Sequence, residues 1–503
     1  MFARRYVLRL CALAVASCAW LALSGCERPK QTQAKNSLTL GMVLEPPGLD
    51  PTAGAASATA EVVLYNVFET LAKIQPDGSV QPLLAQSWEA SPDHKTWTFR
   101  LREGVRFHNG EPLTAATVKY AFERAAAANS TNKDKALFAG FERIETPDAH
   151  TVVLHSRTPN PNLPFLLGQA TAIIVEPKTA AQNNKNPVGT GPYQLADWQK
   201  GAALTLKKWD GYRAASSIAV QSATFRFISD AAAQSAALLA GDVDVFARAQ
   251  VARNLDQFKG DSRFQVLVGA SRAKTIMAMN NGRKPLDDVR VRRAISMAVD
   301  RQAVIQGAAD GLGVPIGSFY VPGAPAYIDT TGITPYDPAK AKALLQEAGI
   351  HNLALTITVP PTPYARQGSE VIAAMLAQVG ITAKIENVEW AQWLSKVYGQ
   401  KEYDLTIISH VEPFDLGNFA KPDYYWNYHS PAFNALYARI LAAADEQERA
   451  ELLAQAQKLV AEDAVAVYLY QPQWITVANS QLQGVWQNMP IFVNDLSALR
   501  WQQ

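Results

Sequence analysis

The stretch LAQSWEASPDHKTWTFRLREGVRFHNGEPLTAATVKYAFER, residues 84–124, carries signals for both kinds of regular structure. Within it, TWTFRL alternates apolar and polar residues, which is the period of a β-strand with one buried face. Gly104 predicts a turn, after which the alternation resumes at Val105 and Phe107, so we expect a pair of strands. Thr114 then precedes a run with helical spacing and can serve as its N-cap.

Strand-like and helix-like segments also alternate through the second half of the chain. In YDPAKAKALLQEAGI, residues 336–350, Asp337 can cap a helix that ends at Gly349. The segments LALTITVP, SEVIAAMLAQVG and ITAKIENVEW follow within residues 353–390 and predict a strand, a helix and a strand. This order is typical of a βαβ unit in a largely parallel sheet. The fold class is therefore α/β, with a ligand expected in a crevice between lobes at the strand ends.

The first 25 residues have the pattern of a secretory signal peptide. Three arginines within the first nine residues precede an almost wholly apolar run at residues 10–23, and Ser24 and Gly25 follow. The apolar run is too short for a comfortable transmembrane helix, which needs about 20 residues. We therefore expect residues 1–25 to be a signal peptide and the rest to be exported.

All three cysteines lie at or before residue 26, at Cys11, Cys18 and Cys26. The segment LSGC that ends at Cys26 resembles a bacterial lipobox, in which the peptide is cut just before the Cys, and the thiol of that Cys takes a diacylglycerol. Residues 26–37 are then a lipidated tether that anchors a periplasmic protein to a membrane. The alternative is an ordinary signal peptide with a chance Cys. A disulfide is excluded for the mature chain, because Cys26 would be its only thiol.

Composition and motifs exclude several classes of function. The chain has 503 residues, 47 basic and 45 acidic residues and a formal net charge of +2, so nothing points to nucleic acid. Its length predicts two or three domains. The sequence contains no G-x-S-x-G elbow, no H-E-x-x-H and no phosphate-binding loop, and its seven histidines are scattered. We therefore expect neither an enzyme nor a bound cofactor.

Four stretches, spread in order along the chain, resemble one family. Together they are similar to the family 5 extracellular solute-binding proteins, which serve ABC importers of peptides, nickel and related solutes. The stretches are residues 84–124, NPVGTGPYQLADWQKGAALTLKKWDGY at 186–212, MNNGRKPLDDVRVRRAISMAVDR at 279–301, and DPAKAKALLQEAGI at 337–350. In the second stretch, the GTGPY segment is expected to be a rigid loop where backbones approach closely.

The resemblance implies a periplasmic binding protein-like fold, in which two jaw lobes are joined by a two-crossover hinge and a third domain is inserted. The hinge is expected near residues 270–279 and 470–479, and binding would shift an open–closed equilibrium. The implied boundaries are 38–60, 185–272 and 478–503 for the discontinuous domain I, 61–184 for the inserted domain II, and 273–477 for domain III.

The resemblance places ligand contacts in YDLTIISHVEPFDLGNFAKPDYYWNYHSPAF, residues 403–433. Peptide-binding members have a Trp-x-x-Asp element here, whose Asp receives the ligand's α-ammonium group. Alignment on the following Asn-Phe puts Glu412 at the Asp and Ser409 at the Trp, while Asp415 matches a second family acid. The alternative is that Glu412 and Asp415 are solvated loop acids or helix caps. Because Ser409 removes an aromatic wall, the ligand is expected to differ in shape from the usual dipeptide.

Other side chains are further candidates for ligand contact. Arg366 lies where some dipeptide binders hold an Arg for the ligand carboxylate, and the alternative is a surface Arg. Aromatic residues after the acids could line the pocket by stacking or could pack in the core. The remaining candidates are Tyr424, Tyr425, Trp426, Trp390, His410, Asn280 and Glu45.

Three functions stay open at this point. The first is a periplasmic binding component, expected to be a monomer, that delivers short peptides or amine-bearing amino-acid conjugates to an ABC permease and ATPase. The second is the same scaffold with a polyamine, an opine, a nickel chelate or haem as its solute. A metal chelate would raise the importance of His410, although no strong metal spacing is present. The third is an exported chaperone-like or sensor module.

Overall fold

The computed structural model describes residues 35–54 and 56–502. The expected signal peptide, Cys26 and most of the expected tether lie outside the described residues and stay predictions. Within the described part of the chain, no helix is long and apolar enough to cross a membrane.

The main structural element is a mixed sheet of twelve strands. Its central path joins strands from both halves of the sequence, and two further strands, β12 (Phe264–Ala270) and β14 (Gly313–Pro315), pair with β18. The order along the path is β16 (Ile381–Asn387), β15 (Leu353–Val359), β17 (Leu405–His410), β13 (Lys274–Met279), β18 (Ala466–Asn479), β11 (Val245–Phe246), β1 (Ser37–Met42), β10 (Ser222–Phe227), β9 (Ala203–Lys208) and β8 (Tyr193–Gln199).

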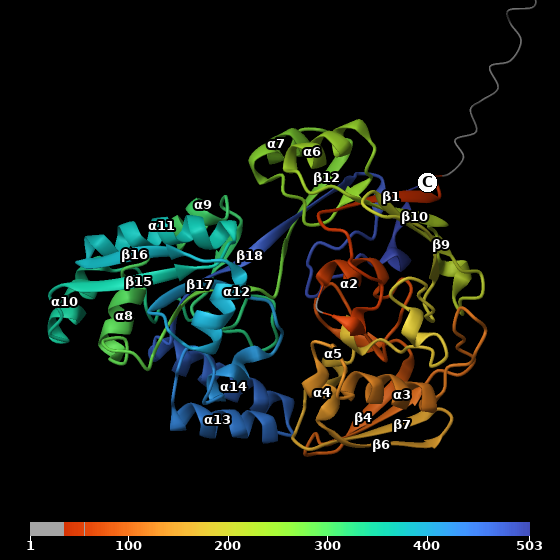
Figure 1. The fold of residues 1–503 in the computed structure, drawn as a ribbon, viewed down its shortest axis with the longest axis horizontal. Helices are drawn as coiled ribbons and strands as arrows, with labels where there is room; N and C mark the ends of the chain where they lie inside the picture. Colours follow the sequence, from red (N-terminus) through yellow and green to blue (C-terminus); the bar gives the residue numbers. More distant parts are fainter. Residues whose placement is uncertain (1–34, 55, 503) are drawn as a thin grey trace, which may run out of the picture. The chain divides into compact units, whose positions relative to one another are not determined.

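Strand β18 pairs with different strands along its two halves. Its first residues pair antiparallel with β13, and its residues from Gln473 to Asn479 pair antiparallel with β12. Pro472, which cannot donate a ladder hydrogen bond, lies where the strand changes partners. The long dark blue strand can be followed between these groups in Figure 1. The expected second crossover near residues 470–479 is thus part of one continuous strand.

Helix caps and the βαβ unit form as the sequence predicts. Strands β15 and β16 run parallel, with helix α11 (Pro363–Gln378) between them in sequence. The side chains of Thr114 and Asp337 accept hydrogen bonds from the first turns of their helices, and Gly241 ends its helix at a φ of 76°. The helices concerned are α3 (Ala115–Ala126), α6 (Ala231–Ala240) and α10 (Pro338–Glu347).

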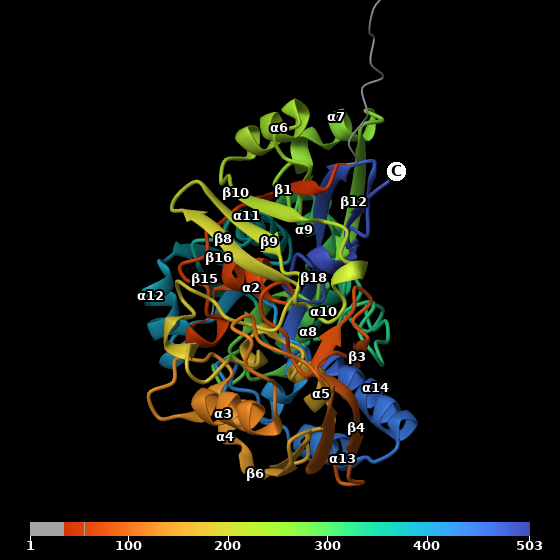
Figure 2. The ribbon, with the colours of Figure 1, turned by 90° about the vertical axis from the view of Figure 1, so that its right-hand side faces the viewer.

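The expected strand pair in residues 96–107 is only half correct. Residues 96–101 form β5, but Val105 and Phe107 belong to no strand, and the chain there makes only an isolated bridge between Arg106 and Pro112. Both side chains are buried, so their spacing reflects packing rather than a ladder. Strand β5 instead pairs with neighbours on both sides in a four-stranded sheet, near which Figure 2 shows α3. That sheet has the order β4 (Ala85–Ala90), β5 (Thr96–Leu101), β7 (Thr151–Ser156) and β6 (Phe141–Asp148).

Strand β13 distributes its side chains between two cores. Met277 and Met279 join one apolar cluster, whereas Ile276 and Ala278 join another. This alternation follows from the two-residue period of a strand, and it leaves helices on both faces of the sheet. The first cluster includes residues of α8 (Val289–Met297), α9 (Arg301–Ala308), α10 and α11; the second includes residues of α12 (Trp390–Trp393), α13 (Pro431–Ala442) and α14 (Glu446–Glu462).

The GTGPY segment lies against the turn that follows helix α2 (Ser57–Val63), as expected from its glycines. A Cβ atom on Gly189 would overlap the carbonyl oxygen of Val67, and one on Gly191 would overlap that of Asn66. Only glycine permits backbones to approach this closely. The prediction of a tight backbone contact at this segment is therefore confirmed.

Candidate functional site

The candidate site is built on the segment that leaves the C-terminal end of β17. That strand ends at His410, Glu412 follows two residues later, and a short 3₁₀ helix begins at Asp415. Phe414 between them has a φ of 56°, in the left-handed region. Glu412 and Asp415, on either side of this residue, have different surroundings.

Asp415 faces a lysine that the sequence analysis did not identify. The Nζ of Lys274, at the start of β13, lies 2.6 Å from an Asp415 carboxylate oxygen and donates to the Glu412 carbonyl at 2.7 Å. The Lys274 and Asp415 side chains are only 4% and 7% exposed. Burial raises the pKa of Asp415 to about 6, although Lys274 opposes the shift. A lysine at the start of the fully buried strand KTIMAM, whose last four residues are apolar, was the available signal.

Glu412, unlike the buried Asp415, has an exposed side chain. It is exposed and lines a cavity of about 220 Å³, together with Lys133 and residues of segments 51–64, 169–171 and 490–492. Its carboxylate accepts a hydrogen bond from the neighbouring Val411 amide, and no described basic side chain lies within 4.0 Å of it. Of the two expected acids, Glu412 is therefore the one available to a ligand.

Arg366 and Trp390 lie outside this cavity. The Arg366 side chain is 49% exposed and lies 3.9 Å from the Glu389 carboxylate. Trp390 is 42% exposed and packs edge-on against Trp393. The structure does not bring either residue into the Glu412 cavity, so their ligand contacts stay predictions.

Two of the aromatic candidates are buried, in line with the core-packing alternative. Tyr425 and Trp426 are each 1% exposed, and the Trp426 ring stacks on Phe419 with centroids 4.5 Å apart. The Tyr425 hydroxyl and the His410 Nε2 lie 2.9 Å apart, and burial lowers the pKa of His410 to about 3. In this structure Tyr425, Trp426 and His410 form part of the core beneath the site rather than a wall of the cavity.

Four further candidates have internal hydrogen bonds. The buried Asn280 amide donates to the carbonyls of Lys401 and Tyr403. The Glu45 carboxylate accepts from the Trp198 indole at 2.9 Å and from a backbone amide. The hydroxyls of Ser409 and Tyr424 accept from Thr275 and Asn418, at 3.3 and 3.2 Å. These contacts describe structural roles, and ligand contact by the four residues stays a prediction.

His410, Glu412 and Asp415 each bring one potential metal-ligand atom within 4.8 Å of the others. The Lys274 ammonium at 2.6 Å from Asp415 already supplies a positive charge to this cluster. A second cation at the same carboxylate would be repelled, so the cluster is better suited to one internal ammonium than to a divalent metal.

Comparison with known proteins agrees with this architecture. Residues 79–428 match the family described as bacterial extracellular solute-binding proteins, family 5 Middle. The di/tripeptide-binding protein 1 of Pseudomonas aeruginosa (strain UCBPP-PA14) is 29% identical over 486 residues, covering 86% of this chain and 89% of the relative. The dipeptide-binding protein of Escherichia coli (strain K12) is 29% identical over 477 residues, covering 84% and 87%.

Solved structures show the same fold. The periplasmic binding protein AgaA of A. tumefaciens R10, in complex with agropinic acid, superposes with a TM-score of 0.76 at 27% identity, covering 93% of this chain and 99% of that chain. HbpA2 from Haemophilus parasuis, at 23% identity, superposes with a TM-score of 0.84 and shows the fold alone. The expected α/β, periplasmic binding protein-like class is therefore confirmed. This chain belongs to the family 5 bacterial extracellular solute-binding proteins, which bind substrates for ABC import.

Proposed function

We propose that this protein captures short peptides or amine-bearing amino-acid conjugates in the periplasm and delivers them to an ABC permease and ATPase. The observation that carries the proposal is Glu412, a carboxylate that opens into a cavity and has no basic partner among the described side chains. The names of the di/tripeptide-binding and dipeptide-binding relatives support the same solute class.

The chemistry favours a single ammonium group at this position. A hydrogen bond between an ammonium and a carboxylate is stronger than a neutral one, and an enclosed ammonium requires a counter-charge. Asp415 cannot fill this role as well, because Lys274 already neutralises it. A solute with several amines would also meet Lys133, which lines the same cavity. These charges disfavour a polyamine.

An opine-like amino-acid conjugate is the second candidate. It is favoured by the likeness to AgaA, whose structure contains agropinic acid. It is also favoured by the Lys274–Asp415 pair, which removes one acid that an ordinary peptide amine could use. Such a solute would still use Glu412 if it kept a basic nitrogen.

The proposal is tested by identifying the solute and then removing its carboxylate partner. The protein, with Cys26→Ala to prevent lipidation, is expressed to the periplasm, denatured, and its released small molecules are identified by mass spectrometry. Calorimetric titration of the identified amine is then repeated with Glu412→Gln. Loss of one charge-assisted hydrogen bond should weaken binding by about tenfold to a hundredfold.

Glu123→Gln is a matched control, because the Glu123 side chain is 59% exposed on helix α3 and lines neither described cavity of the site. It should bind like the wild type. Unchanged affinity of Glu412→Gln for the amine, with an unchanged melting curve, would refute the role of Glu412. A released solute without any basic nitrogen would refute the proposed solute class.

A further inference from the structure

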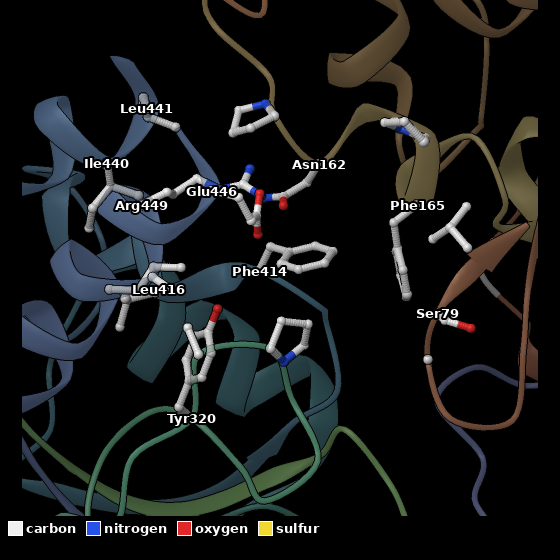
Figure 3. A pocket seen from close by; sticks show the side chains of 18 of the residues that line it. Ser79, Asn162, Phe165, Tyr320, Phe414, Leu416, Ile440, Leu441, Glu446 and Arg449 are labelled. Carbon is white, nitrogen blue, oxygen red and sulfur yellow. The ribbon is translucent and has the colours of Figure 1, made fainter. Parts of the chain in front are cut away.

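A second and larger cavity lies beside the crossover between β12 and β13. Its volume is about 380 Å³, and it is lined by residues from 78–88 and 161–165 on one side and from 414–453 on the other. Figure 3 shows Phe165, Phe414 and Tyr320 pointing into it from different elements. Arg272, in the crossover itself, is the cation that also lines two smaller neighbouring cavities.

The Arg272 guanidinium lies beside two aromatic rings that also contact each other, with centroids 5.0 Å apart. It lies 4.4 Å from the centroid of the Phe165 ring and 5.4 Å from that of Phe414. Its hydrogen bond to the Gly78 carbonyl is long, at 3.5 Å, and no carboxylate within residues 35–54 and 56–502 forms an ion pair with it. Burial lowers the pKa of Arg272.

Three other buried or half-buried arginines have well-placed acceptors for their guanidinium groups. Arg301 donates to the carbonyls of Ile316, Tyr468 and Thr334, and Arg292 donates to three backbone carbonyls. Arg449, which lines the same cavity as Arg272, is paired with Glu446. A guanidinium has five N–H donors, and a buried polar group without partners is costly. For Arg272, by contrast, the only hydrogen bond among the described residues is the long one to Gly78, and its side chain lines a cavity that a ligand can fill.

We propose that Arg272 binds the carboxylate of a second organic ligand, whose apolar body fills this cavity. A single planar guanidinium matches one carboxylate in a bidentate arrangement. The rest of the lining is mainly apolar, with Leu416, Ile440, Leu441 and Leu453 opposite the crossover. The Tyr320 hydroxyl, which points into the cavity, can donate to the same carboxylate. This inference goes beyond the proposed function and does not depend on Glu412.

The cavity lies between two groups of structural elements, so a ligand bound in it would contact both. Gly78 and Phe165 belong to residues 61–184, the expected inserted domain II, whereas Phe414 and helix α14 belong to residues 273–477, the expected domain III. A ligand held by Arg272 would contact both groups of elements at once. It would therefore favour the arrangement in which they lie together.

The test uses two probes with the same apolar body, 3-phenylpropanoate and the uncharged 3-phenylpropanamide. Titration of the wild-type protein should show that the carboxylate binds roughly tenfold more tightly than the amide, the effect of one charge-assisted hydrogen-bonded pair. Arg272→Gln should abolish this preference. Arg253→Gln, a control on a side chain that is 77% exposed, should keep it.

Two further variants keep the experiment decisive. Glu412→Gln should keep the carboxylate preference, so failure of the proposed function and failure of this inference give different results. Leu441→Trp, which fills part of the cavity, should weaken both probes, and it replaces Arg272→Gln if that variant does not fold. Equal binding of acid and amide by the wild type, binding of neither probe, or a preference that survives Arg272→Gln overturns the inference.

Discussion

The Nζ of Lys274 lies 2.6 Å from an Oδ of Asp415, and both side chains are almost fully buried. In the family resemblance, acids of this segment receive a cation from the ligand. Here the chain itself supplies a cation to one of them. The site therefore has one internal ion pair and one free carboxylate, Glu412, where two free acids were expected.

Lys274→Met should destabilise the protein strongly. The substitution keeps the length of the side chain but leaves the Asp415 carboxylate buried without its counter-ion. Breaking a buried pair in this way costs about 3–5 kcal/mol. Denaturant unfolding at neutral pH measures the loss. The double variant Lys274→Met, Asp415→Leu should recover most of it, and a double variant as unstable as the single one would contradict this account.

The pH dependence of stability should reveal the titration of Asp415. Burial raises its pKa from an ordinary 3.8 to about 6, so between these values the folded chain holds a proton that the unfolded chain has lost. The Asp415 contribution to stability is therefore greatest below about pH 4 and declines as the pH rises through 6. The unfolding free energy of the wild type minus that of Asp415→Asn should fall by up to about 1.4 kcal/mol per pH unit in this window. A rising difference would show that the pKa is lowered instead.

The contribution of His410 to stability should change with pH in the opposite direction to that of Asp415. Burial and the nearby Lys274 lower its pKa from 6.5 to about 3, so between these values only the unfolded chain binds the proton. Its contribution is present above about pH 6.5 and is lost as the pH falls toward 3. The stability difference between the wild type and His410→Gln should therefore shrink on acidification. A difference that is constant from pH 4 to 7 would mean that His410 titrates normally.

The buried carboxylate of Glu69 is expected to be essential for stability. It accepts two hydrogen bonds of 2.7 Å from the Arg213 guanidinium and one of 2.9 Å from Thr190 in the GTGPY segment. Glu69→Gln removes the counter-charge and should cost about 3–5 kcal/mol in denaturant unfolding.

The exposed pair Arg143–Glu145 provides the comparison for Glu69. Its side chains are 62% and 41% exposed, so Glu145→Gln should change stability by less than about 1 kcal/mol. If both substitutions had equally small effects, the Glu69 network would not hold the GTGPY segment in place.

Local sequence signals predicted the parts of this fold that local chemistry determines. Caps at Thr114 and Asp337 and the close approach at Gly191 were predictable, because each depends on a few neighbouring atoms. The strand expected around Val105 was not, because alternation shows burial without showing which partner supplies the hydrogen bonds.

The site could be predicted only in part for the same reason. The segment with Glu412 was found by resemblance, but the partner of Asp415 lies 141 positions away on another strand. The depth of Tyr425 and Trp426 likewise depends on how α12, α13 and α14 cover the sheet. No spacing within residues 403–433 determines either property.

Strand β18 has a consequence for how the molecule comes apart. Because one continuous strand completes the hydrogen-bond ladders of both β13 and β12, loss of order in either group leaves unpaired backbone groups in a strand that the other group still holds. The two groups should therefore melt cooperatively, and calorimetry of the whole chain should show a single heat-absorption peak for them rather than two.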